Sequence, residues 1–331
     1  MAARPPTVSI GLPVYNGARY LRAALDDFLA QTWTDFELIV CDNASTDDTE
    51  AIVREAMARD PRIRYVRNER NLGALPNANK TVALSRGCYF CLAAYDDRHT
   101  PEFLERLVQA LEADPGAVLA YGGSVLIDAE GEPFRYDRPT RHYVDGAGRS
   151  VRYVHGLERP LPGDPVARYR AVLKSRGVDA PIHGLFRKDA LVQTAGHQLY
   201  GSDRLIIAHA ALLGRFAFVD APLFHFRIHP GSTLYLDRAA WAERETGRAG
   251  AGKLPETLRT FANYNRAVAA SPLTSRQRVR AYGATLGYAV RPHVLKHLFW
   301  PGPDNYWGWR RWPGQASSLA APSTTTSYAT H

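Results

Sequence analysis

Cysteine is scarce in this chain. Only three of its 331 residues are cysteines, Cys41, Cys88 and Cys91, and all lie in apolar segments of the first third. An odd set of this kind argues against a disulfide framework and suits a reducing compartment. Cys88 and Cys91 form a C-x-x-C pair, but strand alternation would point them to opposite faces. No second pair exists to complete a zinc site, so a redox or metal role for them is disfavoured.

Long apolar runs and an excess of acid are missing as well. No run of about 18 apolar residues occurs, and the residues before Val8 contain no hydrophobic signal core. The chain is therefore predicted to be cytoplasmic. Lys and Arg outnumber Asp and Glu by 41 to 33, which gives a formal net charge of +8. That surplus favours anionic partners such as nucleotide phosphates, nucleic acid or an acidic membrane face.

What is present is an ordinary globular composition, 45% hydrophobic and 22% charged, which supports a sizeable buried core. Over residues 7–125, apolar strand-like segments alternate with segments of helical periodicity. This alternation predicts an α/β fold with a mainly parallel sheet flanked by helices. The expected strands are Val8–Leu12, Phe36–Cys41, Ile63–Val66 and Tyr89–Ala94.

The second half is less regular. Residues 118–127 are predicted to form one or two strands. Residues 128–165 are predicted to form a long excursion from the sheet, and a loop of that length is usually functional or mobile. A strand is expected at 182–186, a helix at 202–213 and strands at 215–220 and 223–228. From 239 to 300 the chain is expected to be helical and basic. Beyond it lie an aromatic and cationic segment, 305–312, and a tail rich in Ser, Thr and Ala that is predicted to be disordered.

Two adjacent carboxylates, Asp96 and Asp97, follow the expected strand Tyr89–Ala94. Ligands of open α/β sheets bind outside the carboxyl ends of the strands. Mg²⁺ prefers carboxylate oxygens and often shares them with substrate phosphates. The pair is therefore a candidate metal site, with a solvated surface loop as the alternative.

Polar residues also follow the first two expected strands. The first ends in Pro13-Val-Tyr-Asn16 rather than in a glycine-rich phosphate loop, so the dinucleotide fingerprint G-x-G-x-x-G is missing. The second ends in Asp42 and Asn43, which are well placed for a base or a ribose. Taken singly, each motif is also compatible with ordinary turn chemistry.

Taken together, the motifs resemble family 2 glycosyltransferases of the GT-A fold. The resemblance covers about residues 7–235 and depends on the order and spacing of six segments. These are Val8–Gly17, Leu38–Thr49, Asn71–Gly73 with Asn79, Tyr95–Asp97, Gly201–Asp203 and Phe226–Ser232.

The resemblance implies a catalytic domain over residues 1–238. Its nucleotide-sugar half would span 7–125 and its acceptor half 126–238. A basic helical and aromatic extension is expected over 239–315 and a disordered tail over 316–331. The implied reaction is transfer of a hexosyl or N-acetylhexosaminyl group from a nucleotide-diphosphate sugar, with UDP as the expected nucleotide. The acceptor would be a hydroxyl or an amine, and the displacement would be direct and inverting, with Mg²⁺ or Mn²⁺.

The resemblance also implies roles for single residues. Asp97 and His229 are the expected metal ligands, although Ala94 stands where the usual D-x-D motif has its first acid and Tyr95 separates it from Asp96. Positive charge on Arg227 suits bidentate contact with phosphate. The expected donor-binding residues are Pro13, Val14, Tyr15, Asn16, Asp42, Asn43, Gly73, Asn79, Asp96 and Arg227.

Asp203 is the candidate general base. An inverting displacement needs a group that takes the proton of the acceptor as its oxygen attacks. Asp203 follows Gly201 and Ser202 at an expected helix start, so a helix N-cap is the structural alternative. His183 and Ser202 are candidate acceptor contacts. The acceptor itself, whether a small molecule, a carrier-bound intermediate or a glycan or lipid-linked chain, stays open.

Rival interpretations are weighed against these motifs. A nucleotidyltransferase that forms nucleotide sugars would be expected to carry a glycine-rich strand turn, which is absent, and a non-catalytic binding module need not keep Asp96, Asp97 and Asp203 together. Nucleic-acid binding is disfavoured because the basic residues are spread along the chain. The segment 305–312 could rest peripherally on the inner face of a membrane, cover the acceptor cleft, form a homodimer contact, or belong to an amphipathic helical appendage.

Overall fold

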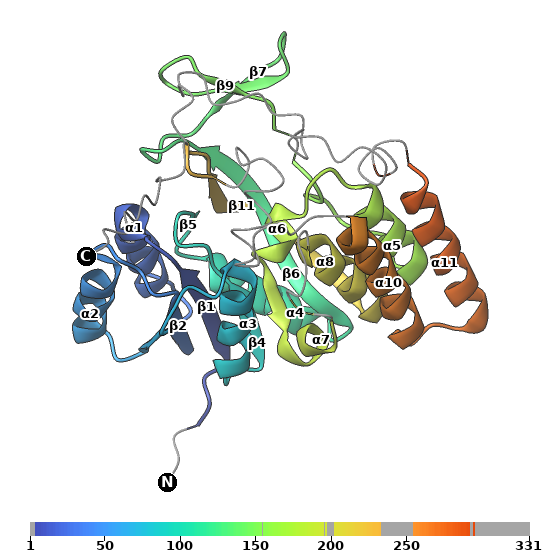
Figure 1. The fold of residues 1–331 in the computed structure, drawn as a ribbon, viewed down its shortest axis with the longest axis horizontal. Coiled ribbons are helices and arrows are strands. Elements are labelled where there is room, and N and C mark those ends of the chain that lie inside the picture. The colour runs from blue at the N-terminus through green and yellow to red at the C-terminus, as the bar shows by residue number, and fades with distance from the viewer. Residues whose placement is uncertain are drawn as a thin grey trace, which may run out of the picture.

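A computed structural model describes residues 4–153, 155–194, 196, 202–232, 254–291 and 294 of the protein (Figure 1). The side chains of Ser202 and of residues 254–257 are outside this description. The expectations for Gly201, for the side chain of Ser202, for 305–312 and for the tail therefore concern residues outside the described part.

An eight-stranded sheet in the order β3-β2-β1-β4-β10-β6-β11-β5 forms the centre of the molecule. The first four strands in the chain are mutually parallel, as the alternating pattern predicts. Almost every residue of the first two is buried, which explains their continuous apolar character. These strands are β1 (Val8–Val14), β2 (Phe36–Asp42), β3 (Ile63–Arg67) and β4 (Tyr89–Leu92).

The other half of the sheet is mixed. Strand β10 (Leu185–Arg187) runs antiparallel to both of its neighbours, β4 and β6 (Ala117–Ile127). Strand β11 (Arg215–Arg227) pairs parallel with β6, and β5 (Arg98–His99) pairs antiparallel with β11. The two strands expected at 215–220 and 223–228 are thus one strand with register shifts around Pro222, because proline cannot donate a ladder hydrogen bond.

Helices cover both faces of the sheet. Neighbouring residues on one strand enter different apolar clusters, since Phe90 packs in one and Cys91 in the other. One cluster contains α1 (Ala18–Leu29), α2 (Thr49–Arg59) and α4 (Phe103–Ala113). Helix α3 (Ala74–Leu84) packs against β1 and β2. The other cluster contains α5 (Pro165–Lys174), α6 (Asp179–Ile182), α7 (Lys188–Gln193) and α8 (Ser202–Leu213).

Two boundaries differ from the sequence expectation. Ile182 ends helix α6, and the strand expected at 182–186 begins at Leu185. The excursion at 128–165 contains an antiparallel sheet of three short strands that projects from the body (Figure 1). We call this sheet the arm. Its strands are β7 (Arg135–Asp137), β8 (His142–Val144) and β9 (Ser150–Val151).

The helical segment expected after residue 239 is confirmed for α10 (Leu254–Ala270) and α11 (Ser275–Ala289). They lie beside α8 and α5 (Figure 1). Tyr264, Ala281 and Tyr288 are buried in the same apolar cluster as α5 and α8. Both helices therefore share the core of the second half of the sheet. Among the residues that the structure describes, none of the helices is long and apolar enough to cross a membrane.

Candidate active site

The carboxyl ends of three parallel strands meet at one edge of the sheet. The loops that follow β1, β2 and β4 are tied together there by backbone hydrogen bonds. Asn43 N–H donates to the Val14 carbonyl at 2.8 Å, and Ala93 N–H donates to the Gly11 carbonyl at 2.8 Å. Gly17 allows close approach of the third loop, because an added Cβ would lie 2.9 Å from the ring of Tyr95. The predicted nucleotide and acidic motifs are thus neighbours.

Asp42 is a fully buried carboxylate at the end of β2. It accepts hydrogen bonds from the Ser45 backbone at 2.8 Å, from the Tyr65 hydroxyl at 2.6 Å and from the Arg67 guanidinium at 2.7 Å. The same carboxylate raises the pKa of Tyr65, after burial itself, to about 12. Asp42 therefore organises this loop, and its direct contact with a nucleoside stays a prediction.

Asn43 fixes the next loop. Its side-chain Nδ2 donates to Asn71 Oδ1 at 2.7 Å and to the Gly73 carbonyl at 3.1 Å, and its Oδ1 accepts from the Leu72 backbone at 2.9 Å. Gly73 has a φ of 88°, a left-handed conformation that favours glycine. The Asn-Leu-Gly motif thus lies against the end of β2, where the resemblance predicts donor contacts.

The turn after β1 differs in exposure along its length. Val14 is buried, Pro13 is partly buried and Tyr15 is 43% exposed. Asn16 has a φ of 50°, and its side chain accepts a hydrogen bond from the Thr46 backbone at 2.8 Å. Tyr15 is therefore the exposed aromatic residue of this turn, and its contact with a nucleoside stays a prediction.

Asp97 is almost fully enclosed. One carboxylate oxygen, Oδ1, accepts a hydrogen bond from the Arg227 backbone at 2.8 Å. Burial raises the pKa of Asp97 well above its usual value, and repulsion from Asp96 adds to the effect. A bound cation would stabilise the ionised form of this group. That Asp97 is the leading metal ligand of the pair stays a prediction.

His229 lies against Asp96. Its Nε2 is 3.1 Å from Asp96 Oδ2, and its Nδ1 accepts a hydrogen bond from the Gly231 backbone at 3.2 Å. A neutral imidazole that accepts at Nδ1 carries its proton on Nε2, so His229 donates to Asp96. Coordination of a metal by Nε2 would require the Gly231 contact to break.

Arg227 is buried at the end of β11. Its Nε donates to the Asp96 carbonyl at 2.6 Å, and its Nη1 donates to the carbonyls of Asp128 and Ala129 at 3.0 and 3.1 Å. The guanidinium also lies over the ring of Tyr20, 4.7 Å from its centroid. These contacts hold the acidic loop against β11, and phosphate contact by Arg227 stays a prediction.

The side chains present fit a divalent cation whose coordination is completed by the substrate. Among the described residues, no group of three or more His, Cys, Asp or Glu side chains surrounds a common metal position. Mg²⁺ is usually held by one or two carboxylates together with substrate phosphates rather than by a complete protein cage. Asp96 and Asp97 supply such a pair, and imidazole with carboxylate also suits Mn²⁺.

A third acid, Asp179, joins the site and was not predicted from sequence. It begins α6, and the Tyr153 hydroxyl donates to its Oδ2 at 3.0 Å. Desolvation raises the pKa of Asp179, and the charge of Asp203 raises it further. Asp179 in turn contributes to the raised pKa of Asp97. It thus interacts electrostatically with both the candidate metal ligand and the candidate base.

His183 and Asp203 both interact electrostatically with Asp179. His183 directly follows α6, and its Nδ1–H donates to the Leu92 carbonyl at 2.9 Å. Its ring stacks on Phe224 with centroids 5.1 Å apart. Asp203 is the second residue of α8, so it lies within the first turn rather than at the N-cap position; its role as the base stays a prediction. The charge of His183 lowers the pKa of Asp179, which places the three residues in one electrostatic group.

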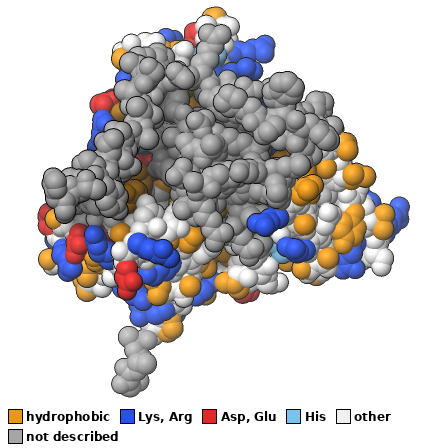
Figure 2. All heavy atoms as spheres, viewed as in Figure 1, with side chains coloured by type: hydrophobic (Ala, Val, Ile, Leu, Met, Phe, Trp, Pro, Cys, Tyr) orange, Lys and Arg blue, Asp and Glu red, His pale blue; other side chains and the backbone are white. Residues whose placement is uncertain are grey.

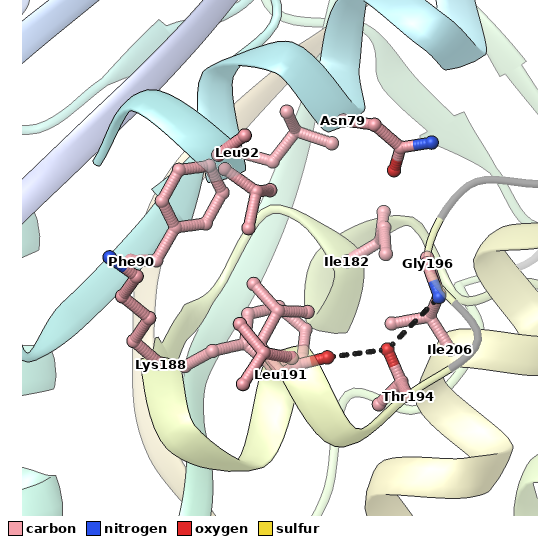
Figure 3. Close-up of a pocket in the computed structure, with 13 residues that line it drawn as sticks. Asn79, Phe90, Leu92, Ile182, Lys188, Leu191, Thr194, Gly196 and Ile206 are labelled. Atoms are coloured by element: carbon pink, nitrogen blue, oxygen red, sulfur yellow. Dashed lines mark hydrogen bonds between the residues drawn. The ribbon is translucent and has the colours of Figure 1, made fainter.

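Asn79 lies at the edge of a separate cavity of about 490 Å³ (Figure 3). The cavity lies between α3, β4, α7 and α8 and is lined mostly by apolar side chains, including Phe90, Leu92 and Ile206. Thr194 donates to the Leu191 carbonyl at 2.7 Å and closes one end. Asn79 is therefore on the other side of β4 from the helices α1 and α2, and its donor contact stays a prediction.

The chain belongs to glycosyl transferase family 2. The sequence profile of that family matches residues 9–191, more than half of the protein. Among curated proteins, an uncharacterized glycosyltransferase of Rickettsia felis is 38% identical over 135 residues, which are 40% of this chain and 22% of that protein. Chondroitin synthase of Escherichia coli is 36% identical over 128 residues, 39% of this chain and 18% of that protein. The chain thus spans less than a quarter of either relative.

Solved structures show the same fold. The protein TarS of S. aureus, residues 1–349 in complex with UDP-GlcNAc, matches 88% of this chain and 78% of its own with a TM-score of 0.60 and 14% identity. A mannosyltransferase of Pyrobaculum calidifontis in complex with GDP-Man and Mn²⁺ matches 89% of this chain and 73% of its own, with a TM-score of 0.50 and 15% identity. The α/β fold predicted from the sequence is confirmed as GT-A.

Proposed function

We propose that this glycosyltransferase moves a hexosyl or N-acetylhexosaminyl group from a UDP-sugar to a hydroxyl or amine acceptor, by inverting direct displacement with Mg²⁺ or Mn²⁺. The observation that carries the proposal is the pair of Asp96 and the buried Asp97, which lies past the carboxyl end of β4 beside His229. A carboxylate on an exposed turn is not desolvated in this way, whereas a site that binds a cation together with a diphosphate uses a desolvated carboxylate.

Separate groups of residues would hold the metal and the nucleotide. Asp97 and Asp96 would hold the metal, and His229 would join them only after its ring releases Gly231. Bound there, a divalent cation neutralises the charge that develops on the leaving diphosphate. The turn at Pro13–Asn16 and the loops ordered by Asp42, Asn43 and Gly73 would hold the nucleotide. Arg227 fixes the acidic loop through its bonds to backbone carbonyls.

Asp203 would take the proton of the acceptor. Its position in the first turn of α8, within electrostatic range of the buried Asp179, supports this role. His183, which follows α6, and Ser202, at the start of α8, would contact the acceptor.

Donor and metal are tested together by thermal shift. We expect UDP to raise the melting temperature more with Mn²⁺ or Mg²⁺ than with EDTA, since ligands that bind only the folded state stabilise it. Asp97→Asn should remove the difference made by the metal while keeping the melting temperature without ligand. Asp26→Asn is a matched control, because this exposed acid on α1 pairs only with Arg59 among the contacts described. GDP serves as the competing nucleotide, and an Asp97→Asn protein with an intact metal effect would refute the assignment.

The base is tested by turnover. Asp203→Asn should slow the release of UDP from UDP-sugars in the presence of a saccharide acceptor panel by about 10²–10⁴-fold, the usual contribution of general-base catalysis. The metal-dependent shift with UDP should stay unchanged. Asp189→Asn, an exposed acid on α7, is the control and should keep full activity. Full activity of Asp203→Asn would refute the base assignment.

A further inference from the structure

The arm carries an aromatic pair on one of its faces. Tyr136 on β7 and Tyr143 on β8 are direct cross-strand partners, with ring centroids 5.0 Å apart. Tyr136 is 47% exposed, and Tyr143 is partly exposed. Tyr143 packs against the apolar cluster that contains Phe134 and Val151, whereas Tyr136 lies outside that cluster. The pair is a surface available to a ligand.

The pair continues into further rings toward the body of the molecule. His155 lies 5.5 Å from Tyr143, centroid to centroid, and its side chain is 28% exposed. Tyr153 lies 5.1 Å from His155 and 5.8 Å from Phe226 on β11. Tyr153 is buried, so it anchors the arm to β11. We call Tyr136, Tyr143 and His155 the aromatic surface of the arm.

The path ends at the candidate acceptor residues. Phe226 lies 6.2 Å from Phe224, and the ring of His183 stacks on Phe224. The hydroxyl of Tyr153 donates to Asp179. One residue of the path, Tyr153, therefore contacts both the arm and the group that includes Asp203. Ring contacts through the buried side chains of Tyr153 and Phe224 therefore connect the aromatic surface to the site.

Polar groups border the rings. Nδ1 of His155 is 2.7 Å from Glu158 Oε1, and Ser124 donates to Glu158 through both its hydroxyl and its backbone N–H. The Glu158 carboxylate is thus fixed by two residues and sets the orientation of the imidazole. Aromatic faces beside a few oriented polar groups are the usual composition of a small-ligand site.

We propose that the aromatic surface of the arm binds sugar units of an oligosaccharide acceptor, one or more units away from the hydroxyl that is glycosylated. A pyranose ring presents an apolar C–H face to Tyr136 and Tyr143 and a rim of hydroxyls to His155. Aromatic rings bury large areas at small entropic cost, which suits an otherwise hydrophilic ligand. The inference rests on the proposed glycosyltransferase function and narrows its acceptor to a glycan chain.

A membrane is the less suitable occupant of the same surface. Acidic residues accompany the basic ones on the arm, because Asp137 lies beside Tyr136 and Glu132 is exposed nearby. Anionic lipid would favour an uninterrupted basic face. Figure 2 also shows Lys and Arg side chains in several separate groups on the visible face, outside the grey atoms.

The test is binding of the full chain to an array of defined neutral tetrasaccharides and their monosaccharides. We expect at least one tetrasaccharide to bind and Tyr136→Ala to weaken that binding about tenfold, a loss typical of one removed aromatic contact. Tyr136→Phe keeps the ring and should bind normally. Tyr282→Ala removes a tyrosine of similar exposure (36%) from α11 and is the matched control.

Two readouts separate this inference from the proposed function. The metal-dependent shift with UDP should be the same in all four proteins, because the arm does not contribute to the donor residues. A normal UDP shift with no tetrasaccharide bound, or with equal binding by Tyr136→Ala, overturns the arm proposal alone. Binding to phosphatidylglycerol vesicles that Tyr136→Ala abolishes, without glycan binding, also overturns it. A missing UDP shift in the unaltered protein would instead contradict the proposed function.

Discussion

At the scale of single residues, His99 is enclosed by aromatic rings. Its ring centroid lies 4.5 Å from that of Phe28, 4.6 Å from Phe103 and 5.6 Å from Phe224. Neither ring nitrogen has a hydrogen-bond partner within the described part of the chain. Burial, together with nearby positive charge on His183 and other groups, lowers the pKa of His99 to about 3. The folded protein therefore keeps this imidazole neutral.

Replacement of His99 should change how stability depends on pH. Because the folded pKa is depressed below the unfolded value of 6.5, stability is complete above 6.5 and falls as the pH drops toward 3. Between pH 7 and pH 5 this residue should account for about 2 kcal/mol of lost stability. His99→Phe should remove that loss in urea denaturation at the two pH values. His142→Gln on the arm is the control, and an unchanged pH dependence in His99→Phe would contradict the argument.

Sequence patterns predicted which residues end the strands but not which partners they have there. Asp97 lies past the carboxyl end of β4 and beside the end of β11. Its place after β4 could be predicted, because the end of an apolar run marks the carboxyl end of a strand. Asp179 could not be found in this way. Its partner Tyr153 is 26 residues earlier, after a segment whose course no periodicity describes. The three bonds of Asp42 depend in the same manner on Tyr65 and Arg67 from another strand.

At the scale of elements, β10 joins the two halves of the sheet. It pairs with β4 on one side and β6 on the other, although it has only three residues. The preceding turn brings His183 to the Leu92 carbonyl, next to the strand that leads to Asp96. Because β10 runs antiparallel to both neighbours, the sheet is mixed at this point.

Helix α11 begins with a capping box. The Thr274 hydroxyl accepts from the Gln277 backbone at 3.3 Å, and the Gln277 side chain accepts from the Thr274 backbone at 3.0 Å. Thr274→Ala should lower the free energy of unfolding by about 1 kcal/mol, the usual loss for such a cap. Ser275→Ala changes the first helical residue and should stay within about 0.5 kcal/mol of the unaltered protein. Equal effects of the two changes in chemical denaturation would contradict a role for the box.

Helical periodicity predicted the helices better than strand alternation predicted the strands of the arm. The stripe Tyr20, Leu21, Leu25 and Phe28 of α1 is buried, as its spacing indicates. The strands of the arm have two or three residues each, which is too short for an alternation to stand out. Gly131 and Gly148, with φ of 99° and 76°, mark turns of this region, but a turn signal alone does not specify pairing.

At the scale of the whole molecule, the carboxyl-terminal helices α10 and α11 pack into the same apolar cluster as α5 and α8. The hydroxyls of Tyr169 on α5 and Thr285 on α11 are hydrogen-bonded at 2.7 Å in the buried interior. The rings of Tyr264 on α10 and Tyr288 on α11 lie 5.9 Å apart in the apolar cluster that also contains α8. We propose that the boundary at residue 238 marks a change in sequence character within one cooperative folding unit.

A substitution in α10 tests this view. Tyr264 is 1% exposed, so Tyr264→Ala should cost about 3–5 kcal/mol, the usual loss for truncating a buried aromatic side chain. Leu258 is on the same helix but 57% exposed, and Leu258→Ala should change stability by less than about 0.5 kcal/mol. Because the cluster reaches the sheet, Tyr264→Ala should lower the midpoint of one single transition, followed both by far-UV circular dichroism and by loss of UDP-dependent protection. A separate early transition confined to helical signal, with UDP protection kept to the original midpoint, would show instead that α10 and α11 fold apart from the domain that carries Asp97 and Asp203.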